Sequence, residues 1–218
     1  MTTAIRASGL LLDMDGTLVD STPVVERVWR EWSAAHGLDP AEVLSVVHGR
    51  QSHESMAILL PDRSHAENMA DHRAMLARET AETEGIVEIP GAASFLAALA
   101  RLPHALVTSA TDALARARLA AAGLDAPEKA IMAEHVSASK PDPEGFLAGA
   151  AALGLPPAGC VAFEDSPAGI AAARAAGMRV VGIGEATREL GADWSVRDLA
   201  AVRVEADGGE IVVYVDAL

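Results

Sequence analysis

An apolar run that ends in two aspartates lies near the start of the chain and limits the folds open to it. Leu10, Leu11 and Leu12 are followed directly by Asp13-Met14-Asp15-Gly16. Three consecutive leucines are typical of a fully buried strand. Because side chains of an extended backbone alternate with a period of two, Asp13 and Asp15 emerge on the same side. Two like charges so close repel each other, which favours a divalent cation, a raised carboxyl pKa, or both. The stretch therefore predicts a metal site at the carboxyl end of a central strand, where open α/β sheets bind their ligands.

The overall charge and cysteine content exclude several classes of protein. The chain has 218 residues, half of them hydrophobic, and a net charge of −14. This length suits one large α/β domain, or a core with a small insert. The acidic charge argues against a nucleic-acid partner, although a local site can still bind an anion. The single cysteine, Cys160, excludes an intramolecular disulfide and fits a reducing compartment. No apolar run is as long as a membrane span, and residues 1–6 lack a signal-peptide pattern, so we expect a cytoplasmic protein without a membrane partner. A monomer is the default expectation.

Residues 21–85 carry a helical pattern with no sign of a strand. The spacing of apolar residues and the Pro and Gly breaks predict helices over residues 22–36, 40–47, 52–60 and 64–82. Five of the seven histidines fall here, but none has a companion acid at the spacing of a zinc motif, so we expect solvated or substrate-facing roles for them. We predict an α/β core domain from residues 1–20 and 86–218, and a separate helical domain from residues 21–85.

Strand and helix patterns alternate after residue 86. Strands are predicted at residues 104–109, 130–133, 160–165 and 179–184, and helices at residues 92–101, 111–123, 143–153 and 167–176. Such alternation is typical of a doubly wound, Rossmann-like parallel sheet with helices on both faces. Residues 211–215 form a further apolar run, which we interpret as an edge strand.

Polar side chains follow four of the predicted strands. They are Asp13 and Asp15, Thr108 and Ser109, Glu164 and Asp165, and Lys140 after the third strand in this part of the chain. In a doubly wound sheet these ends open on one face. Carboxylates bind a hard dication, Mg²⁺ by default, while a lysine and a hydroxyl bind phosphate oxygens. One carboxylate can act as a nucleophile that forms an aspartyl-phosphate, and a second can transfer protons. The combination favours phosphoryl transfer.

Each of these residues also has a plainer interpretation. The two aspartates after Leu12 are compatible with a simple turn, and Lys140 and Arg50 with ordinary solvated side chains. Thr108 and Ser109 suit a helix cap, and Glu164-Asp165 suits a helix N-terminus. Four such segments in one chain favour the catalytic interpretation over these separate ones.

The same segments resemble the haloacid dehalogenase (HAD) superfamily of phosphohydrolases, in its β-phosphoglucomutase-like branch. The resemblance covers essentially the whole chain and rests on four ordered motifs, at residues 13–21, 107–109, 139–143 and 163–170. It implies a Rossmann-like core in which residues 21–85 form an inserted α-helical cap that closes over the substrate and excludes water.

The resemblance also implies a role for each motif residue. Asp13 is the nucleophile and Asp15 the general acid/base, with Lys140 completing the catalytic set. Asp13, the backbone carbonyl of Asp15 and Asp165 bind Mg²⁺, with Glu164 as a weaker candidate. The phosphate is held by Thr108, the Ser109 backbone and Lys140. We also expect Arg50, in the loop between two cap helices, to contact the substrate.

Two residues narrow the reaction within this superfamily. Dehalogenases lack the second aspartate, so Asp15 indicates phosphate chemistry. The mutases that resemble this chain carry a histidine in the first cap helix, where this chain has Val25. We therefore expect a phosphatase of a small sugar or polyol phosphate, similar to glycerol-phosphate and 2-deoxyglucose-6-phosphate phosphatases. A sugar-phosphate mutase and a catalytically inactive binding protein of the same fold are the alternatives.

Overall fold

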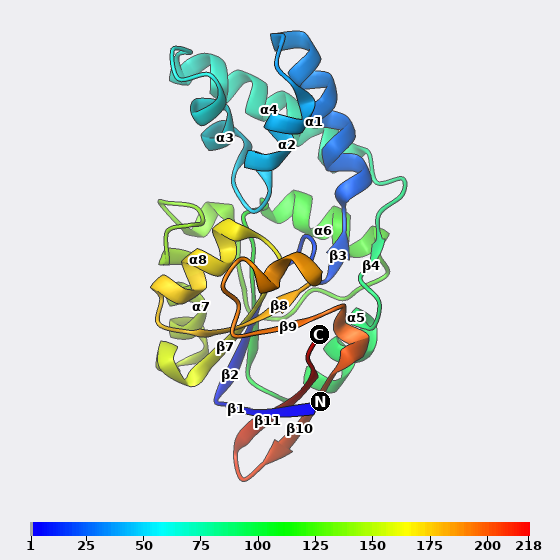
Figure 1. The fold of residues 1–218 in the computed structure, drawn as a ribbon, viewed down its shortest axis with the longest axis vertical. Helices are drawn as coiled ribbons and strands as arrows, with labels where there is room; N and C mark the ends of the chain where they lie inside the picture. Colours follow the sequence, from blue (N-terminus) through cyan, green and yellow to red (C-terminus); the bar gives the residue numbers. More distant parts are fainter. Residues whose placement is uncertain (1) are drawn as a thin grey trace.

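A six-stranded parallel sheet forms the centre of the molecule. The computed structural model describes residues 2–218, and Figure 1 shows the sheet beneath a group of four helices. The strand order is β6-β5-β2-β7-β8-β9, and every neighbouring pair is parallel. The strands are β2 (Gly9–Leu12), β5 (His104–Val107), β6 (Ala130–Ile131), β7 (Cys160–Glu164), β8 (Arg179–Ile183) and β9 (Trp194–Val196). The expected doubly wound α/β sheet is confirmed.

The strand order reverses at β2. After β2 the chain adds β5 and β6 on one side, and then crosses to add β7, β8 and β9 on the other side. A crevice forms at such a switch point because the connections on the two sides diverge from it. The run that ends in Asp13 therefore lies at the position where this fold binds its ligands.

Helices cover both faces of this sheet, and the buried strands divide their side chains between the two. Leu10 and Leu12 pack in one cluster with Phe95 of α5 (Ala92–Leu99) and Leu114 of α6 (Asp112–Ala121). Leu11 packs in the other cluster, which includes residues of α7 (Glu144–Leu153) and α8 (Pro167–Ala175). A strand covered on both faces needs apolar residues at consecutive positions. This explains why the strand pattern is a continuous run.

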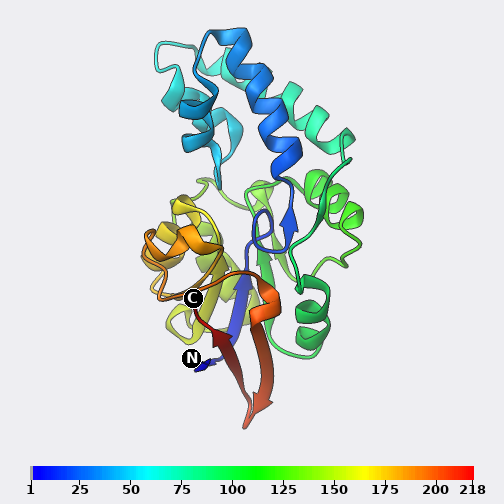
Figure 2. The same cartoon turned by 45° about the vertical axis from the view of Figure 1, so that its right-hand side comes forward.

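Four helices form a second layer above the carboxyl ends of the strands (Figure 2). They are α1 (Thr22–His36), α2 (Pro40–Val47), α3 (Ser52–Leu59) and α4 (His65–Ala81). These helices have a hydrophobic cluster of their own, built from Val28, Trp29, Trp32, Val43, Val47, Met56 and Met75. The two chain segments that join this unit to the core pair as β3 (Val19–Asp20) and β4 (Val87–Glu88). The helices at residues 22–36, 40–47, 52–60 and 64–82 are thus found within one or two residues of their predicted ends.

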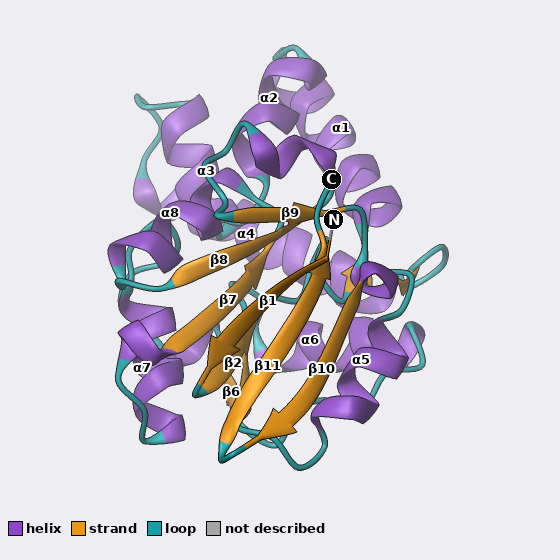
Figure 3. Cartoon of the chain, turned by 60° about the horizontal axis from the view of Figure 1, so that its bottom comes forward, coloured by secondary structure: helices purple, strands orange, loops and turns teal. Residues whose placement is uncertain are grey.

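The C-terminal strand is not an edge strand of the main sheet. Figure 3 shows a separate antiparallel sheet in which β11 (Glu210–Asp216) lies between β1 (Thr2–Ala7) and β10 (Val202–Asp207). The edge-strand prediction for residues 211–215 was wrong because it missed both partners. Half of the residues in each partner are polar, and β1 pairs with residues about two hundred positions away. β10 does alternate apolar and polar residues, which is a strand signal that the prediction overlooked. Among residues 2–218, every helix is too short or too polar to cross a membrane.

Candidate active site

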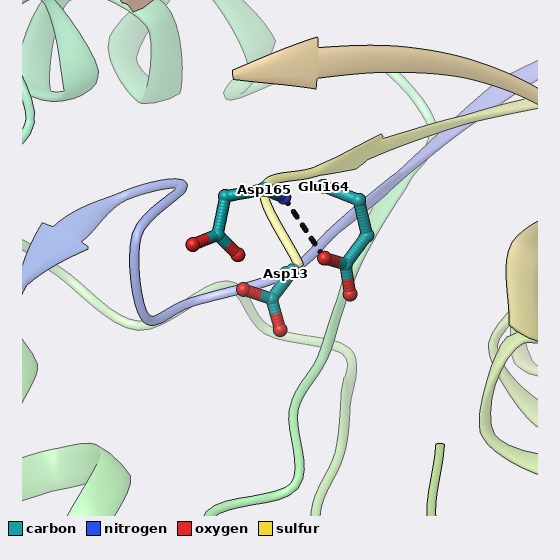
Figure 4. A group of neighbouring side chains, drawn as sticks. All are labelled: Asp13, Glu164 and Asp165. Atoms are coloured by element: carbon teal, nitrogen blue, oxygen red, sulfur yellow. Dashed lines mark hydrogen bonds between the residues drawn. The ribbon is translucent and has the colours of Figure 1, made fainter. Parts of the chain in front are cut away.

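The predicted site residues come together above the carboxyl end of β2. Figure 4 shows three acidic side chains there: Asp13, which follows β2, and Glu164 and Asp165 at the end of β7. One carboxylate oxygen from each lies within 4.8 Å of the others. Asp13 is 6% exposed and Glu164 is 0% exposed. Three acids in a buried cluster are stable only with compensating positive charge or bound protons.

The turn after β2 fits closely around one of these acids. Gly16 has a φ of +81°, and a Cβ atom at this position would lie 1.8 Å from Oδ2 of Asp165. A side chain here would therefore be strained and would displace the acid. The backbone carbonyl of Met14 closes the turn by accepting from Leu18 (2.8 Å) and Val19 (2.9 Å). Because Gly16 has no side chain, the turn after β2 can lie directly against Asp165 at the end of β7.

Lys140 supplies the positive charge within the cluster. Its Nζ donates to Asp13 Oδ1 (2.5 Å), to Glu164 Oε1 (2.7 Å) and to the Val107 carbonyl (3.0 Å), and the residue is 5% exposed. Burial by itself lowers the pKa of Lys140, but the two carboxylates more than offset this and raise it above the usual value. Lys140 is therefore a permanent cation beside Asp13.

Glu164 has both carboxylate oxygens engaged by protein donors. While Oε1 accepts from Lys140, Oε2 accepts from the backbone N–H groups of Asp165 (2.9 Å) and Ser166 (3.1 Å) and from the Ser166 hydroxyl (3.1 Å). A Cβ atom at Gly169 would lie 1.7 Å from Oε1, so the helix backbone approaches this carboxylate very closely. By contrast, no protein group within residues 2–218 donates a hydrogen bond to the Asp165 carboxylate.

The two aspartates of the cluster, Asp13 and Asp165, hold protons more tightly than usual. Burial raises the pKa of Asp13 to about 8, with a further contribution from Glu164, and Lys140 opposes both. Burial and the charge of Glu164 also raise the pKa of Asp165 well above its ordinary value. A hard dication would relieve this repulsion, and clustered carboxylate oxygens are the ligands that such cations prefer. The residues present therefore fit a hard divalent cation.

Asp15 lies in a different environment from Asp13. Its Oδ1 accepts from the Ser21 hydroxyl (2.6 Å), and its Oδ2 lies 2.9 Å from Nη1 of Arg118. Arg118 Nη2 in turn donates to Glu79 Oε2 (2.6 Å). Burial raises the pKa of Glu79, and Arg118 opposes this shift. The two aspartates of the opening motif thus have separate partners.

Sequence reasoning missed Arg118 and Glu79. They belong to two separate helices, α6 and α4, and no local motif marks either of them. One signal was present, because Arg118 falls on the same helical face as Leu114 and next to Leu119, which are both buried. A charged residue on an apolar helical face needs a buried partner, but the sequence did not indicate which one.

A cavity of about 130 Å³ lies between the core and the helical unit. Its core side includes Asp13, Asp15, Thr108, Ser109 and Asp165, and its helical side includes Val25, His48, Arg50, His72 and Glu79. Lys140 instead lines a smaller hollow together with Thr108 and Ser109. The structure therefore brings Arg50 and five of the strand-end residues to one cavity, whereas Lys140 and Glu164 lie outside its lining and contact each other and Asp13.

The helical unit lies directly against the core around this cavity. The Ser109 hydroxyl donates to the Gly49 carbonyl (3.0 Å), and the Ser139 hydroxyl hydrogen-bonds to Glu54 of α3. A Cβ atom at Gly49 would lie 2.2 Å from Ser166 Oγ. These contacts, with the Glu79–Arg118 ion pair, hold the helical unit against the core beside the cavity.

Comparison with known proteins identifies the family. Residues 7–177 match the haloacid dehalogenase-like hydrolase family. The chain is 45% identical over 181 residues to hexitol phosphatase A of Escherichia coli, covering 82% of this chain and 84% of that one. It is 32% identical over 217 residues to glycerol-1-phosphate phosphohydrolase 2 of Saccharomyces cerevisiae, covering 92% and 86%. A crystal structure of β-phosphoglucomutase from Clostridium difficile has the same fold, with a TM-score of 0.78, 23% identity, and coverage of 88% and 92%. The chain belongs to the haloacid dehalogenase-like hydrolase family.

Proposed function

We propose that this protein is a Mg²⁺-dependent phosphatase that hydrolyses a small sugar or polyol phosphate through an aspartyl-phosphate intermediate. The observation that carries the proposal is that Asp13 and Asp15 have different interaction partners. Asp13 lies beside Lys140 and Asp165, whereas Asp15 lies beside Ser21 and Arg118 at the cavity wall. These different surroundings support a proposal in which Asp13 attacks phosphorus and Asp15 transfers protons.

The reaction has two steps. A carboxylate oxygen of Asp13 forms a bond to phosphorus while the ester bond breaks, and Asp15 gives a proton to the departing oxygen. A water molecule then attacks the aspartyl-phosphate, Asp15 takes the proton of that water, and phosphate leaves as Asp13 is regenerated. Lys140, Thr108 and the Ser109 backbone are proposed to neutralise or bind the phosphate oxygens, with Arg50 as a further contact from the helical side.

The proposed metal ligands are Asp13, the Asp15 carbonyl and Asp165. Mg²⁺, when bound, would neutralise phosphate charge and oppose the repulsion among the acids. Glu164 stays a weaker candidate, since protein donors already engage both of its oxygens and its contact with Lys140 suits a residue that holds the lysine in place. The division into a core of residues 1–20 and 86–218 and a cap of residues 21–85 is part of the same proposal, supported by the separate hydrophobic cluster of α1 to α4.

The substrate class is proposed from two relatives and from the cavity. Hexitol phosphatase A and glycerol-1-phosphate phosphohydrolase 2 are named for polyol phosphates. A cavity of about 130 Å³ suits a small leaving group. The cytoplasmic location, the monomeric state and the lack of a nucleic-acid or membrane partner stay predictions from the sequence.

The alternative is a sugar-phosphate mutase, since β-phosphoglucomutase shares the fold. Val25 lines the cavity at the position where the mutases that resemble this chain carry a histidine, and an aliphatic side chain cannot replace that histidine in proton transfer or hydrogen bonding. This favours the hydrolase. A mutase would convert a hexose 1-phosphate into the 6-phosphate, whereas a phosphatase would only release phosphate from it, and ³¹P NMR separates the two products.

The test of the proposed function is phosphate release from a panel of sugar and polyol phosphates with Mg²⁺. We expect Asp13→Asn to lower kcat by more than about 10³-fold, because it removes the nucleophile. Asp62→Asn is the matched control, as Asp62 is exposed. Retention of activity in Asp13→Asn would refute the nucleophile assignment. Binding of sugar phosphates without turnover by the unaltered protein would instead favour the inactive binding protein.

A further inference from the structure

The contact between the helical unit and the core buries an arginine that the proposed reaction does not use. Arg118 is 4% exposed, and its guanidinium lies between Asp15 of the core and Glu79 of α4. Its Nε is buried and has no hydrogen-bond partner within residues 2–218. A buried ion pair is on average no more stabilising than well-packed apolar side chains. Stability alone therefore does not explain why charged residues occupy these two positions.

Arg118 anchors one carboxylate oxygen of Glu79 and leaves the other without a donor in the described part of the chain. The anchored oxygen is Oε2, whereas Oε1 accepts no hydrogen bond from residues 2–218, and Glu79 lines the cavity. Two leucines flank this pair in the cavity lining, Leu76 one helical turn before Glu79 and Leu114 one turn before Arg118, while His72 and Thr111 also line the cavity. A largely buried carboxylate oxygen that has no donor prefers a ligand that can donate to it.

The position of Glu79 indicates which part of a substrate meets it. Asp15 is proposed to protonate the leaving oxygen, so the carbon next to that oxygen lies near Asp15. Arg118 contacts Asp15, and Glu79 contacts Arg118. If the leaving group extends from Asp15 along this side of the cavity, the carbons next to the ester oxygen are the ones that lie beside Glu79.

We propose that Glu79 is a specificity-determining residue that accepts a hydrogen bond from a hydroxyl group of the leaving alcohol, close to the ester, and that Arg118 is the positioning residue that holds it. This inference rests on the proposed phosphatase function and specifies its substrates as phosphate esters of neutral polyhydroxy alcohols. A leaving group that is a simple alkyl chain would leave Oε1 of Glu79 without a hydrogen-bond donor. A site built around a substrate hydroxyl rejects the analogue that lacks it, for this reason.

The test compares two phosphate esters that differ only in hydroxyl groups, glycerol 1-phosphate and n-propyl phosphate. We expect the unaltered protein to prefer glycerol 1-phosphate in kcat/KM, and Glu79→Ala to reduce this preference by about 10- to 100-fold, as expected for one hydrogen bond to a charged group. The matched control is Glu84→Ala, an exposed glutamate just after α4, which should keep the preference of the unaltered protein.

A second variant guards against loss of folding. Glu79→Gln keeps the side-chain volume and an oxygen for Arg118 but removes the charge, and it should reduce the preference in the same direction. If kcat/KM falls equally for both esters, the preference is unchanged and Glu79 has only a structural role. If kcat/KM does not change for either ester, the proposal is also overturned.

Calorimetric binding of the two esters to Asp13→Asn, with and without Glu79→Ala, measures the same preference without turnover. Collapse of the binding preference supports the role of Glu79, and its persistence refutes it. Because this readout does not need catalysis, it decides the proposal even if the unaltered protein releases no phosphate, an outcome that would refute the proposed function alone.

Discussion

Replacing Lys140 by methionine should lower the free energy of unfolding by about 3–5 kcal/mol. Methionine has nearly the same length and is apolar, so the change removes the charge without opening a large cavity. The cost arises because Lys140 contacts Asp13 and Glu164, which are both buried and would lose their counter-ion. Removing one partner of a buried ion pair costs much more than the pair contributes, since the remaining charge stays desolvated.

The size of the effect should depend on pH and on a second substitution. Asp13 can take up a proton, so the loss should be larger at pH 8.5, above the pKa of about 8, than at pH 5.5. Glu164→Gln in the Lys140→Met background removes one of the two stranded charges and should recover part of the loss. A coupling energy of about 0.5–3 kcal/mol is expected for residues in direct contact.

Urea unfolding followed by far-UV circular dichroism, in EDTA, measures these free energies. For a chain of this length, 3–5 kcal/mol corresponds to a fall in Tm of roughly 6–20 °C. The control is Lys129→Met, which alters the only other lysine, an exposed one, and should change stability by less than about 0.5 kcal/mol. If Lys140→Met behaves like Lys129→Met, or if the two substitutions at positions 140 and 164 are additive, the three side chains do not form the buried ionic cluster described here.

Three further predictions concern the acidic cluster and its surroundings. Without metal, the native protein holds a proton on Asp13 that the unfolded chain, in which this carboxyl has a pKa near 3.8, has released. The free energy of unfolding in EDTA should therefore fall as the pH rises from about 4 to 8. Thermal melting should show a shallower dependence of Tm on pH for Asp13→Asn, or for the unaltered protein with Mg²⁺. Gly16→Ala should lower Mg²⁺ affinity by at least about 10-fold in a calorimetric titration, because the new Cβ displaces Asp165 and the φ of +81° is strained; unchanged affinity would contradict the Asp165 assignment. Ser21→Ala should lower kcat by roughly 10-fold for glycerol 1-phosphate and less for p-nitrophenyl phosphate, whose leaving group needs little protonation, because Asp15 loses the donor to its Oδ1; equal losses would argue against the proton-transfer role of Asp15.

Local patterns in the sequence were sufficient for most of the helices and for the buried parallel strands. Leu10 to Leu12 predict a strand because a sheet covered on both faces needs apolar residues at consecutive positions, and that requirement is local. The convergence of Asp13, Thr108 and Asp165 was also predictable, since all parallel strands end on the same edge. Each of these inferences uses only the nearest few residues and a rule of sheet topology.

Pairing between distant segments was not predictable in the same way. β1 is half polar, and its pairing depends on β11, which is far from it in the chain. β10 instead alternates apolar and polar residues and joins β11 through Gly208-Gly209, a local hairpin signal that the sequence prediction missed. Ser21 directly precedes α1, but its hydroxyl donates a hydrogen bond to Asp15 instead of capping the helix. No local preference distinguishes these two uses of a serine.

Short-range periodicity in the sequence was enough to predict five of the six strands of the main sheet, the four helices α1 to α4 and the strand-end groups that meet at one edge, whereas β9 was missed. How those groups share their contacts followed from the packing of distant segments: Lys140 and Glu164 lie around Asp13, and Arg118 and Glu79 lie beside Asp15. Arg118 and Glu79 are 39 residues apart on different helices. Their contact exists only because the helical unit packs on the core, and a pattern within one helix carries no information about the side chain it will face.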